Sequence, residues 1–203
     1  DEHTSRGLGD VYKRQSLANH TSGIPRMPNN FSNSSEKNPL NPYKEYKIDD
    51  LEKYLLDSLK INHDTQGKFL YSNLGFALLG YTLIKIDNQD YKSMFDSYIF
   101  SKYDMTNSTF KKEEVNDLLV KGLNSQGDEV PNWDLQIFGP AGGVLSNAED
   151  MAKFIIAQFD EKDKELKLLR AQTSKINSRL GMGIGWFIEN PKSNKKRMYR
   201  HGG

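Results

Sequence analysis

The chain has 203 residues, of which 36% are hydrophobic and 27% charged, so it is long enough to bury a core while keeping a polar surface. Lys and Arg (28) nearly balance Asp and Glu (27), and the net charge of +1 gives no electrostatic reason to expect a nucleic-acid partner. The absence of cysteine excludes disulfides and thiolate metal sites, and no apolar run approaches the ~20 residues of a membrane-spanning helix.

The N-terminal part of the chain lacks a periodic apolar pattern. Residues 1–15 look foreign to the sequence that follows, and we interpret them as a non-native or disordered leader. Residues 16–47 carry four prolines among many Asn and Ser residues. This composition predicts a connecting loop region with little regular structure.

Helical periodicity dominates residues 48–180, which we expect to form a mainly helical subdomain. An Asp-Asp pair suits the positive end of a first helix, which places four apolar residues on one face: Leu51, Tyr54, Leu55 and Leu59. Residues 74–86 are apolar on nearly all sides and predict a buried helix, with Asn73 at the position of its N-cap. Residues 90–100 predict a further amphipathic helix.

Two more helices are expected in the second half of this subdomain. Residues 146–149 read Ser-Asn-Ala-Glu, the pattern of a capping box that contributes ~1 kcal/mol to a helix start. The helix after it carries four apolar residues: Met151, Phe154, Ile155 and Phe159. Residues 162–172 are rich in charge and predict a surface helix.

The pattern changes to a period of two near the end of the chain. Residues 181–189 alternate large apolar side chains with glycines, which predicts a strand whose backbone is closely approached at the glycines. Residues 190–195 supply turn residues, and residues 197–201 predict a second strand. We therefore expect a β-hairpin here and assign residues 181–203 to the edge of a sheet domain.

Four blocks carry most of the information on function: Leu17-Ala18-Asn19-His20-Thr21-Ser22-Gly23-Ile24-Pro25; Tyr71-Ser72-Asn73-Leu74-Gly75 with Leu78-Leu79-Gly80; Gly139-Pro140-Ala141-Gly142-Gly143-Val144-Leu145-Ser146 with Asp150-Met151-Ala152-Lys153-Phe154; and Gly183-Ile184-Gly185-Trp186 with His201-Gly202-Gly203. In this order they resemble four blocks of the class C β-lactamase-like serine hydrolases: L-x-x-H-T-S-G-[LI]-P, Y-S-N-x-G, P-A-G-G-L-x-S-x-x-D-M-A-x-F, and the G-x-G-W strand with the third catalytic motif. This superfamily includes penicillin-binding DD-peptidases and carboxylesterases. The resemblance covers residues 16–203.

The resemblance implies an α+β protein, with a mainly helical subdomain and an incomplete antiparallel-sheet domain of the serine β-lactamase/DD-peptidase fold. It also implies a serine hydrolase that forms an acyl-enzyme with a small-molecule ester, amide or peptide, needs no cofactor or metal, and works in the periplasm or cell envelope. Tyr71, Asn73 and His201 match catalytic positions, with Tyr71 as proton acceptor and Asn73 orienting the substrate. Gly202 and Gly203 match the substrate-binding strand.

The family's Ser-x-x-Lys nucleophile motif precedes the His-Thr-Ser-Gly block, and the sequence holds none there. We therefore expect a piece of a longer protein, inactive by itself. Ser34-x-x-Lys37 and Ser193-x-x-Lys196 fit the bare pattern, but both follow that block, and we expect both serines to be solvated. His20 and Ser22 suggest a base and a nucleophile, but a lone histidine in such a turn is more often a local hydrogen-bonding device.

His201 stands where many relatives carry lysine. A histidine side chain is mostly neutral at pH 7, whereas lysine is a permanent cation suited to a substrate carboxylate. Esterase or peptidase activity is therefore at least as consistent with the motif as β-lactam hydrolysis. A non-catalytic penicillin-binding or sensor module on the same fold is the alternative, and the residues leave membrane anchoring open.

Overall fold

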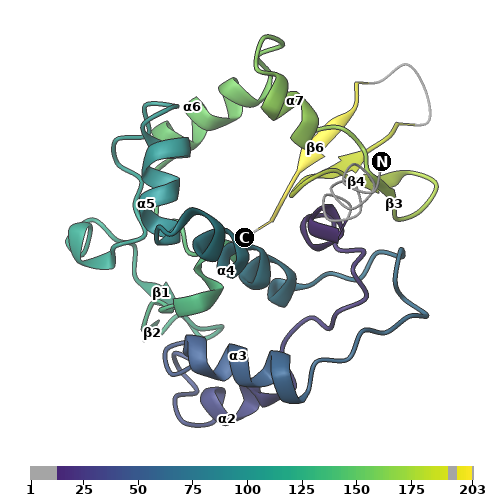
Figure 1. The fold of residues 1–203 in the computed structure, drawn as a ribbon. Helices are drawn as coiled ribbons and strands as arrows, with labels where there is room; N and C mark the ends of the chain where they lie inside the picture. Colours follow the sequence, from purple (N-terminus) through teal and green to yellow (C-terminus); the bar gives the residue numbers. More distant parts are fainter. Residues whose placement is uncertain (1–12, 192–195, 203) are drawn as a thin grey trace.

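A computed structural model describes residues 13–191 and 196–202. Figure 1 shows α4 near the centre of the molecule, α2 and α3 at one end, and α5, α6 and α7 along an arc that leads to an antiparallel sheet. The helices are α2 (Ser32–Ser35), α3 (Ile48–Asp57), α4 (Asn73–Asp87), α5 (Tyr91–Phe95), α6 (Ala148–Gln158) and α7 (Lys164–Leu169). A π-helical turn (Asp96–Phe100) continues α5, and 3-10 turns occupy Asn29–Phe31, Lys112–Glu114 and Gln136–Ala141. This is the expected α+β class.

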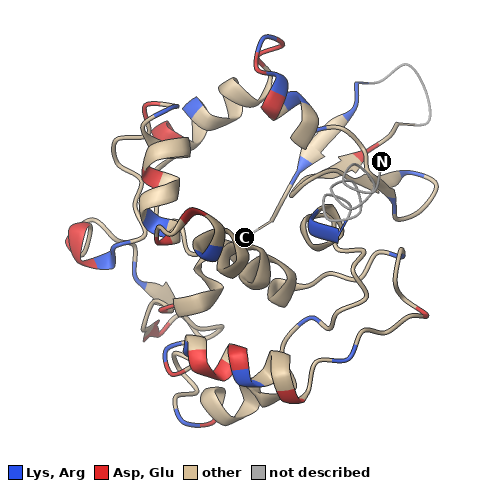
Figure 2. Cartoon of the chain, viewed as in Figure 1, with Lys and Arg blue, Asp and Glu red and all other residues tan. Residues whose placement is uncertain are grey.

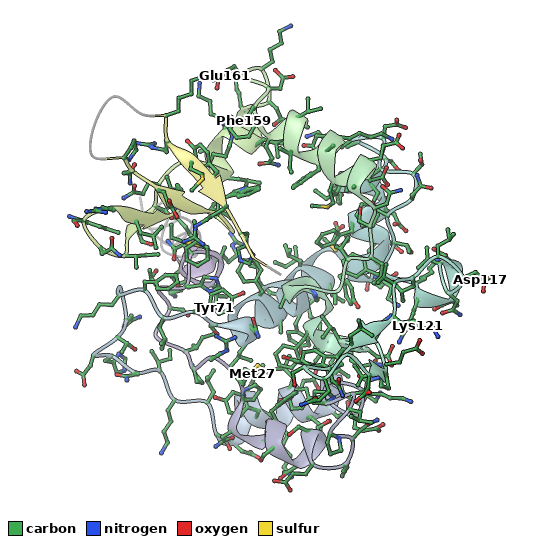
Figure 3. All side chains as sticks on the ribbon, turned by 180° about the vertical axis from the view of Figure 1, so that it is seen from behind. Met27, Tyr71, Asp117, Lys121, Phe159 and Glu161 are labelled. Carbon is green, nitrogen blue, oxygen red and sulfur yellow. The ribbon has the colours of Figure 1, made fainter. Side chains whose placement is uncertain are left out.

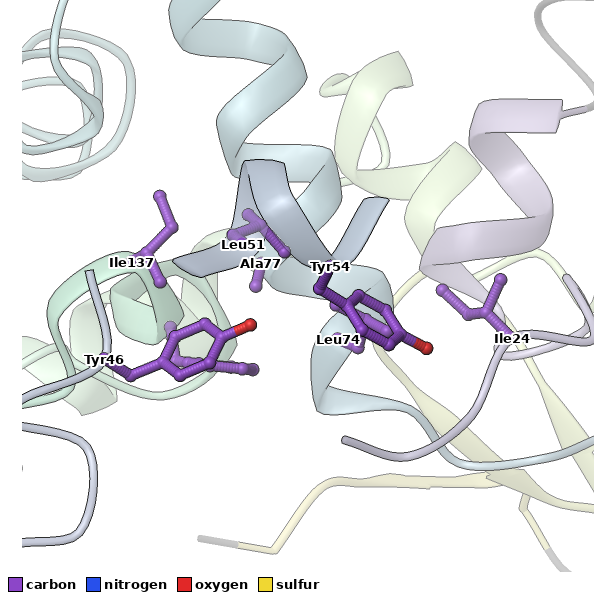
Figure 4. Packing of buried hydrophobic residues seen from close by; sticks show 8 residues of the cluster. Ile24, Tyr46, Leu51, Tyr54, Leu74, Ala77 and Ile137 are labelled. Atoms are coloured by element: carbon purple, nitrogen blue, oxygen red, sulfur yellow. The ribbon is translucent and has the colours of Figure 1, made fainter. Parts of the chain in front are cut away.

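The main core lies between α3, α4 and the turn Gln136–Ala141 (Figure 4). Its buried members come from these elements and from the loop before α3: Ile24, Tyr46, Leu51, Tyr54, Leu74, Ala77, Ile137 and Phe138. Leu51 and Tyr54 are buried as the periodicity of α3 predicts, and Leu55 and Leu59 pack against the same cluster. The core thereby fixes the N-terminal half of α4.

A four-stranded antiparallel sheet has the order β3 (Ser174–Lys175), β4 (Leu180–Met182), β5 (Phe187–Glu189) and β6 (Met198–Arg200). The pairing of β5 with β6 confirms the predicted hairpin, with Ile188 opposite Tyr199. A single strand over residues 181–189 is wrong, because a turn closed by the Gly183 N–H and the Trp186 carbonyl, 2.8 Å apart, divides it into β4 and β5. The close approach predicted at glycine is present: a Cβ on Gly183 would lie 2.4 Å from the Leu169 carbonyl oxygen.

Several local expectations need correction. Residues 13–18 are helical, where we expected the end of a leader and the start of a loop. The N-caps of α4 and α6 are Ser72 and Asn147, each one residue away from the expected Asn73 and Ser146. The short hairpin of β1 (Gly122–Leu123) and β2 (Glu129–Val130) was not predicted. Residues 192–195 of the expected hairpin tip lie outside the described residues.

The predicted apolar faces of α4 and α6 are only partly covered. On α4, Leu83 and Ile86 are 40% and 63% exposed, so its C-terminal half is a surface helix and not the buried one that we expected. Met151 and Ile155 of α6 and its C-cap residue Phe159 are each more than 40% exposed. The buried residues of α6 are instead polar: Asp150 and Gln158.

Candidate active site

The site is organised by the residues that precede α4. The Ser72 hydroxyl accepts a hydrogen bond from the Gly75 N–H (2.9 Å), capping the helix, and donates one to the Pro25 carbonyl (2.7 Å). The Leu74 N–H donates to the carbonyl of Arg26 (3.1 Å). These bonds join the loop of the first sequence block to the Tyr-Ser-Asn block, so that Tyr71 and Asn73 are held on either side of a buried cap.

The buried side chain of His20 supports the Tyr-Ser-Asn segment through a hydrogen bond. Its side chain is 1% exposed, and Nδ1 accepts a hydrogen bond from the Ser72 N–H (3.1 Å), which places the proton of the neutral ring on Nε2. Burial first, and then the neighbouring His201, lower the pKa of His20 to about 4. A neutral ring already used as an acceptor is a positioning group, in agreement with the local hydrogen-bonding role expected for it.

The structure brings Tyr71 and His201 together. Their ring centroids are 6.3 Å apart. The centroid of the His20 ring lies 4.3 Å from that of the Tyr71 ring. Figure 3 shows Tyr71 near the middle of the molecule, beside the chain that leads to the C-terminus. His201 directly follows β6, whose pairing with β5 also sets its ring 5.7 Å from Phe187. The convergence of these distant residues on one site is thus observed.

Asn73 lies in the first turn of α4 and is partly buried. Its amide nitrogen is 3.9 Å from the Met27 sulfur. Tyr43 is its other neighbour: burial raises the pKa of the Tyr43 phenol, while Arg26 and a hydrogen bond from Asn73 oppose that rise. Gly202 is exposed, and Gly203 lies outside the described residues.

Sequence reasoning missed two residues of this site, Arg26 and Tyr43. The guanidinium carbon of Arg26 lies 5.1 Å from the centroid of the Tyr71 ring. Arg26 directly follows the first sequence block, so its position beside the block was a usable signal. Tyr43 lies in the Pro- and Asn-rich loop before α3, and nothing in the sequence indicates that this loop reaches Asn73.

Of the two serines of the bare Ser-x-x-Lys patterns, Ser34 lies within the described residues and does not join the site. Ser34 lies on α2, which Figure 1 shows well away from the C-terminal residues beside α4. The expectation that Ser34 is solvated is wrong, because it is 5% exposed, with no partner for its hydroxyl among the described residues. Ser193 lies outside the described residues. Ser72 is also unsuited as a nucleophile, since its hydroxyl is engaged as donor and acceptor.

A cavity of about 640 Å³ lies elsewhere, beside the β1–β2 hairpin and the turn Gln136–Ala141. Tyr91, Phe110 and Trp133 are among its walls, and none of Tyr71, Asn73 and His201 lines it. Within residues 13–191 and 196–202, no group of three His, Asp or Glu side chains is placed to hold a metal ion.

No helix in the described part of the chain is both long enough and apolar enough to cross a bilayer.

Tyr71 lies just before the core helix α4, and His201 lies just after the strand β6. The chain places this pair on the serine β-lactamase/DD-peptidase fold. The sequence matches the family described as Beta-lactamase over residues 15–203, and the chain belongs to that family. Beta-lactamase-like protein 2 of Dictyostelium discoideum is 31% identical over 172 residues, which are 78% of this chain and 30% of that protein.

Two solved structures share the fold. The octameric penicillin-binding protein homologue from Pyrococcus abyssi is 24% identical with a TM-score of 0.67, covering 85% of this chain and 42% of its own. The D-amino acid amidase from Ochrobactrum anthropi SV3, complexed with L-phenylalanine, is 19% identical with a TM-score of 0.70, covering 97% of this chain and 59% of its own. The chain therefore spans about a third to three fifths of the length of these relatives.

Proposed function

We propose that the chain carries the Tyr-Ser-Asn and His-Gly-Gly parts of the active site of a serine acyl-hydrolase, whose nucleophile lies on a stretch of polypeptide outside these 203 residues. The observation that supports this most directly is the 6.3 Å separation of the Tyr71 and His201 rings at a hydrogen-bonded helix start. The family membership supplies the reaction class, acyl transfer to a serine.

In the proposed reaction the serine oxygen attacks the carbonyl carbon of an ester or amide, and its proton passes to Tyr71. The tetrahedral intermediate collapses to an acyl-serine while the leaving group takes up the proton. Water then attacks the acyl-serine by the same route in reverse. A phenol that accepts a proton must itself be ionised, which requires cationic neighbours. A lysine of the nucleophile segment is the expected neighbour.

Asn73 and His201 are proposed to hold the substrate on either side of Tyr71. The Asn73 amide, which contacts the Tyr43 phenol and the Met27 sulfur in the described structure, is proposed to turn to a polar edge of the substrate. His201 stands in the third motif, and Gly202 and Gly203 would continue as the strand along which the substrate lies. His201 is not a permanent cation, so an ester, amide or peptide substrate is at least as consistent with the third motif as a β-lactam. A place in the cell envelope remains a prediction from the family resemblance.

The proposal is tested with two proteins: the 203-residue chain, and a longer version that adds the residues encoded immediately upstream. Each is assayed with a chromogenic short-chain ester and a chromogenic cephalosporin. We expect no turnover by the 203-residue chain and ester turnover by the longer version. In the longer version Tyr71→Phe should lower kcat by about a thousandfold or more, since catalytic groups that act as a unit have effects of this size.

Ser22→Ala and Ser34→Ala in the longer version are the matched controls and should leave ester turnover unchanged. Turnover by the 203-residue chain alone, lost on either of these serine substitutions, would show that the nucleophile is within the chain. A longer version that acquires no label from a fluorescent penicillin and turns over neither substrate would contradict the hydrolase proposal.

A further inference from the structure

We propose that Arg26 is a specificity-determining residue that binds a carboxylate of the substrate beside Tyr71. The proposal rests on the function proposed above and names its substrate class as anionic acyl compounds. Three features of the molecule support it. Arg26 lies beside Tyr71, it has no carboxylate partner among the described residues, and the segments that carry Arg26, Tyr71 and His201 lack acidic residues.

The backbone of Arg26 is fixed to the catalytic motif. Its carbonyl accepts the hydrogen bond from the Leu74 N–H, and the preceding carbonyl, of Pro25, accepts the one from the Ser72 hydroxyl. Pro25 and the buried Pro28 restrict the loop on both sides. Any movement of the Arg26 backbone relative to Tyr71 must therefore break bonds at the start of α4, so the point from which its side chain extends is fixed beside the site.

The side chain of Arg26 is exposed, and its guanidinium carbon lies over the Tyr71 ring at 5.1 Å from the centroid. A guanidinium held against an aromatic face keeps its N–H groups free at the edge of its plane, where they match the two oxygens of a carboxylate. Arg26 forms no ion pair with any carboxylate that the structure describes, whereas Arg200 pairs with Glu189 at 2.6 Å. Its donors are thus available to a ligand.

The segments that carry Arg26, Tyr71 and His201 contain no acidic residue, although Asp and Glu make up 27 of the 203 residues. Four acid-free ranges meet there: 16–35, 65–86, 166–188 and 196–202. Figure 2 shows the loop between residues 19 and 28 with blue and without red. With a permanent cation over the Tyr71 ring and no acidic residue in these four ranges, the surroundings of Tyr71 favour an anion.

Arg26 is better suited to this role than His201. An arginine is charged at every physiological pH and offers a planar fork, whereas a histidine offers one or two single donors. The Arg26 guanidinium also lies close enough to the Tyr43 phenol to lower its pKa against the effect of burial. It therefore acts on two tyrosines of the site, Tyr71 and Tyr43.

The test compares a matched pair of ligands, N-acetylalanine and its neutral amide, each as both enantiomers. Binding to the 203-residue chain and to the longer version is measured by NMR titration, so the readout does not depend on turnover. We expect the carboxylate of the preferred enantiomer to bind at least about tenfold more tightly than its amide, a ratio that hydrogen bonds to a charged group supply. Arg26→Gln should remove this preference, and added salt should weaken it.

Arg26→Lys restores the charge without the fork and should recover only part of the preference. Arg179→Gln removes an exposed arginine elsewhere and should change nothing. Equal binding of acid and amide to the unsubstituted protein, or an unchanged preference in Arg26→Gln, would overturn the inference. If the longer version hydrolyses neutral esters but shows either of these results, this inference fails while the proposed function stands. If Arg26→Gln removes the preference for the carboxylate but the longer version turns over no acyl substrate, the proposed function fails while Arg26 is still shown to bind a carboxylate.

Discussion

At the scale of single residues, the site depends on buried contacts behind the groups that meet a substrate. His20 accepts the Ser72 N–H, and Ser72 in turn caps α4 and bonds the Pro25 carbonyl. His20 also adopts a positive φ of 61°, which few side chains other than Asn, Asp and His tolerate. Because His20 Nδ1 accepts the Ser72 N–H, the folded structure uses the neutral form of the ring. Protonation of His20 should therefore oppose folding.

This gives a pH dependence of stability whose sign follows from the pKa. An unfolded histidine binds a proton below about pH 6.5, while folded His20 does so only near pH 4. Between these values the unfolded state binds more protons, so acidification destabilises the fold, by up to about 1 kcal/mol per pH unit. Above this window the effect is absent. Urea unfolding from pH 7 down to about pH 4.5 measures it.

His20→Asn is the comparison, since asparagine tolerates the positive φ and does not titrate. The substitution should lower stability at pH 7, because the Ser72 N–H loses its acceptor, and should flatten the acid limb of the curve. If the unfolding free energies of the two proteins fall in parallel with decreasing pH, then His20 is not the group responsible.

At the scale of elements, α4 packs closely against the turn Gln136–Ala141. A Cβ on Gly80 would lie 2.3 Å from Cγ of Pro140, a ring that cannot rotate away. Replacing a helical glycine by alanine normally stabilises a helix by about 1 kcal/mol. Here the overlap should reverse that effect, and Gly80→Ala should lower the unfolding free energy by about 1–3 kcal/mol.

Gly142→Ala is the matched control for this prediction. Its φ of 163° lies outside the left-handed region, and the nearest atom to an added Cβ would be 3.9 Å away. Its unfolding free energy should stay within about 0.5 kcal/mol of the unsubstituted protein. A stabilised Gly80→Ala protein would show that α4 can move away from the turn at no cost.

The elements also show what the sequence could predict. Each long helix was found, because apolar periodicity reports an amphipathic segment directly. The caps were misplaced by one residue at Ser72 and Asn147, since Ser and Asn both cap well and stand side by side in both places. The apolar residues of α6 were identified, and two of them, Met151 and Ile155, are exposed. A pattern identifies an apolar face without specifying what packs on it.

At the scale of the whole molecule, the ordered blocks predicted that Tyr71 and His201 converge. The blocks allowed this prediction because members of a family share a three-dimensional arrangement of their motifs, which no local pattern in one sequence reveals. Arg26 and Tyr43 could not be found in that way, since their place depends on how two proline-containing loops fold back on α4. The four-strand order was likewise hidden by the glycine-rich run, in which Gly183 and Gly185 make a turn between two strands.

The central claim is that this site serves acyl transfer to a serine outside the 203 residues, with Tyr71 moving the proton. The longer version is incubated with an activated ester, quenched, and digested, and the acylated peptide is located by mass spectrometry in the unsubstituted and Tyr71→Phe proteins. We predict one acylated serine, upstream of this chain, with acylation slowed about a thousandfold or more by Tyr71→Phe. Acylation of Ser22, Ser34 or Ser72, or an acylation rate unaffected by Tyr71→Phe, would contradict the account.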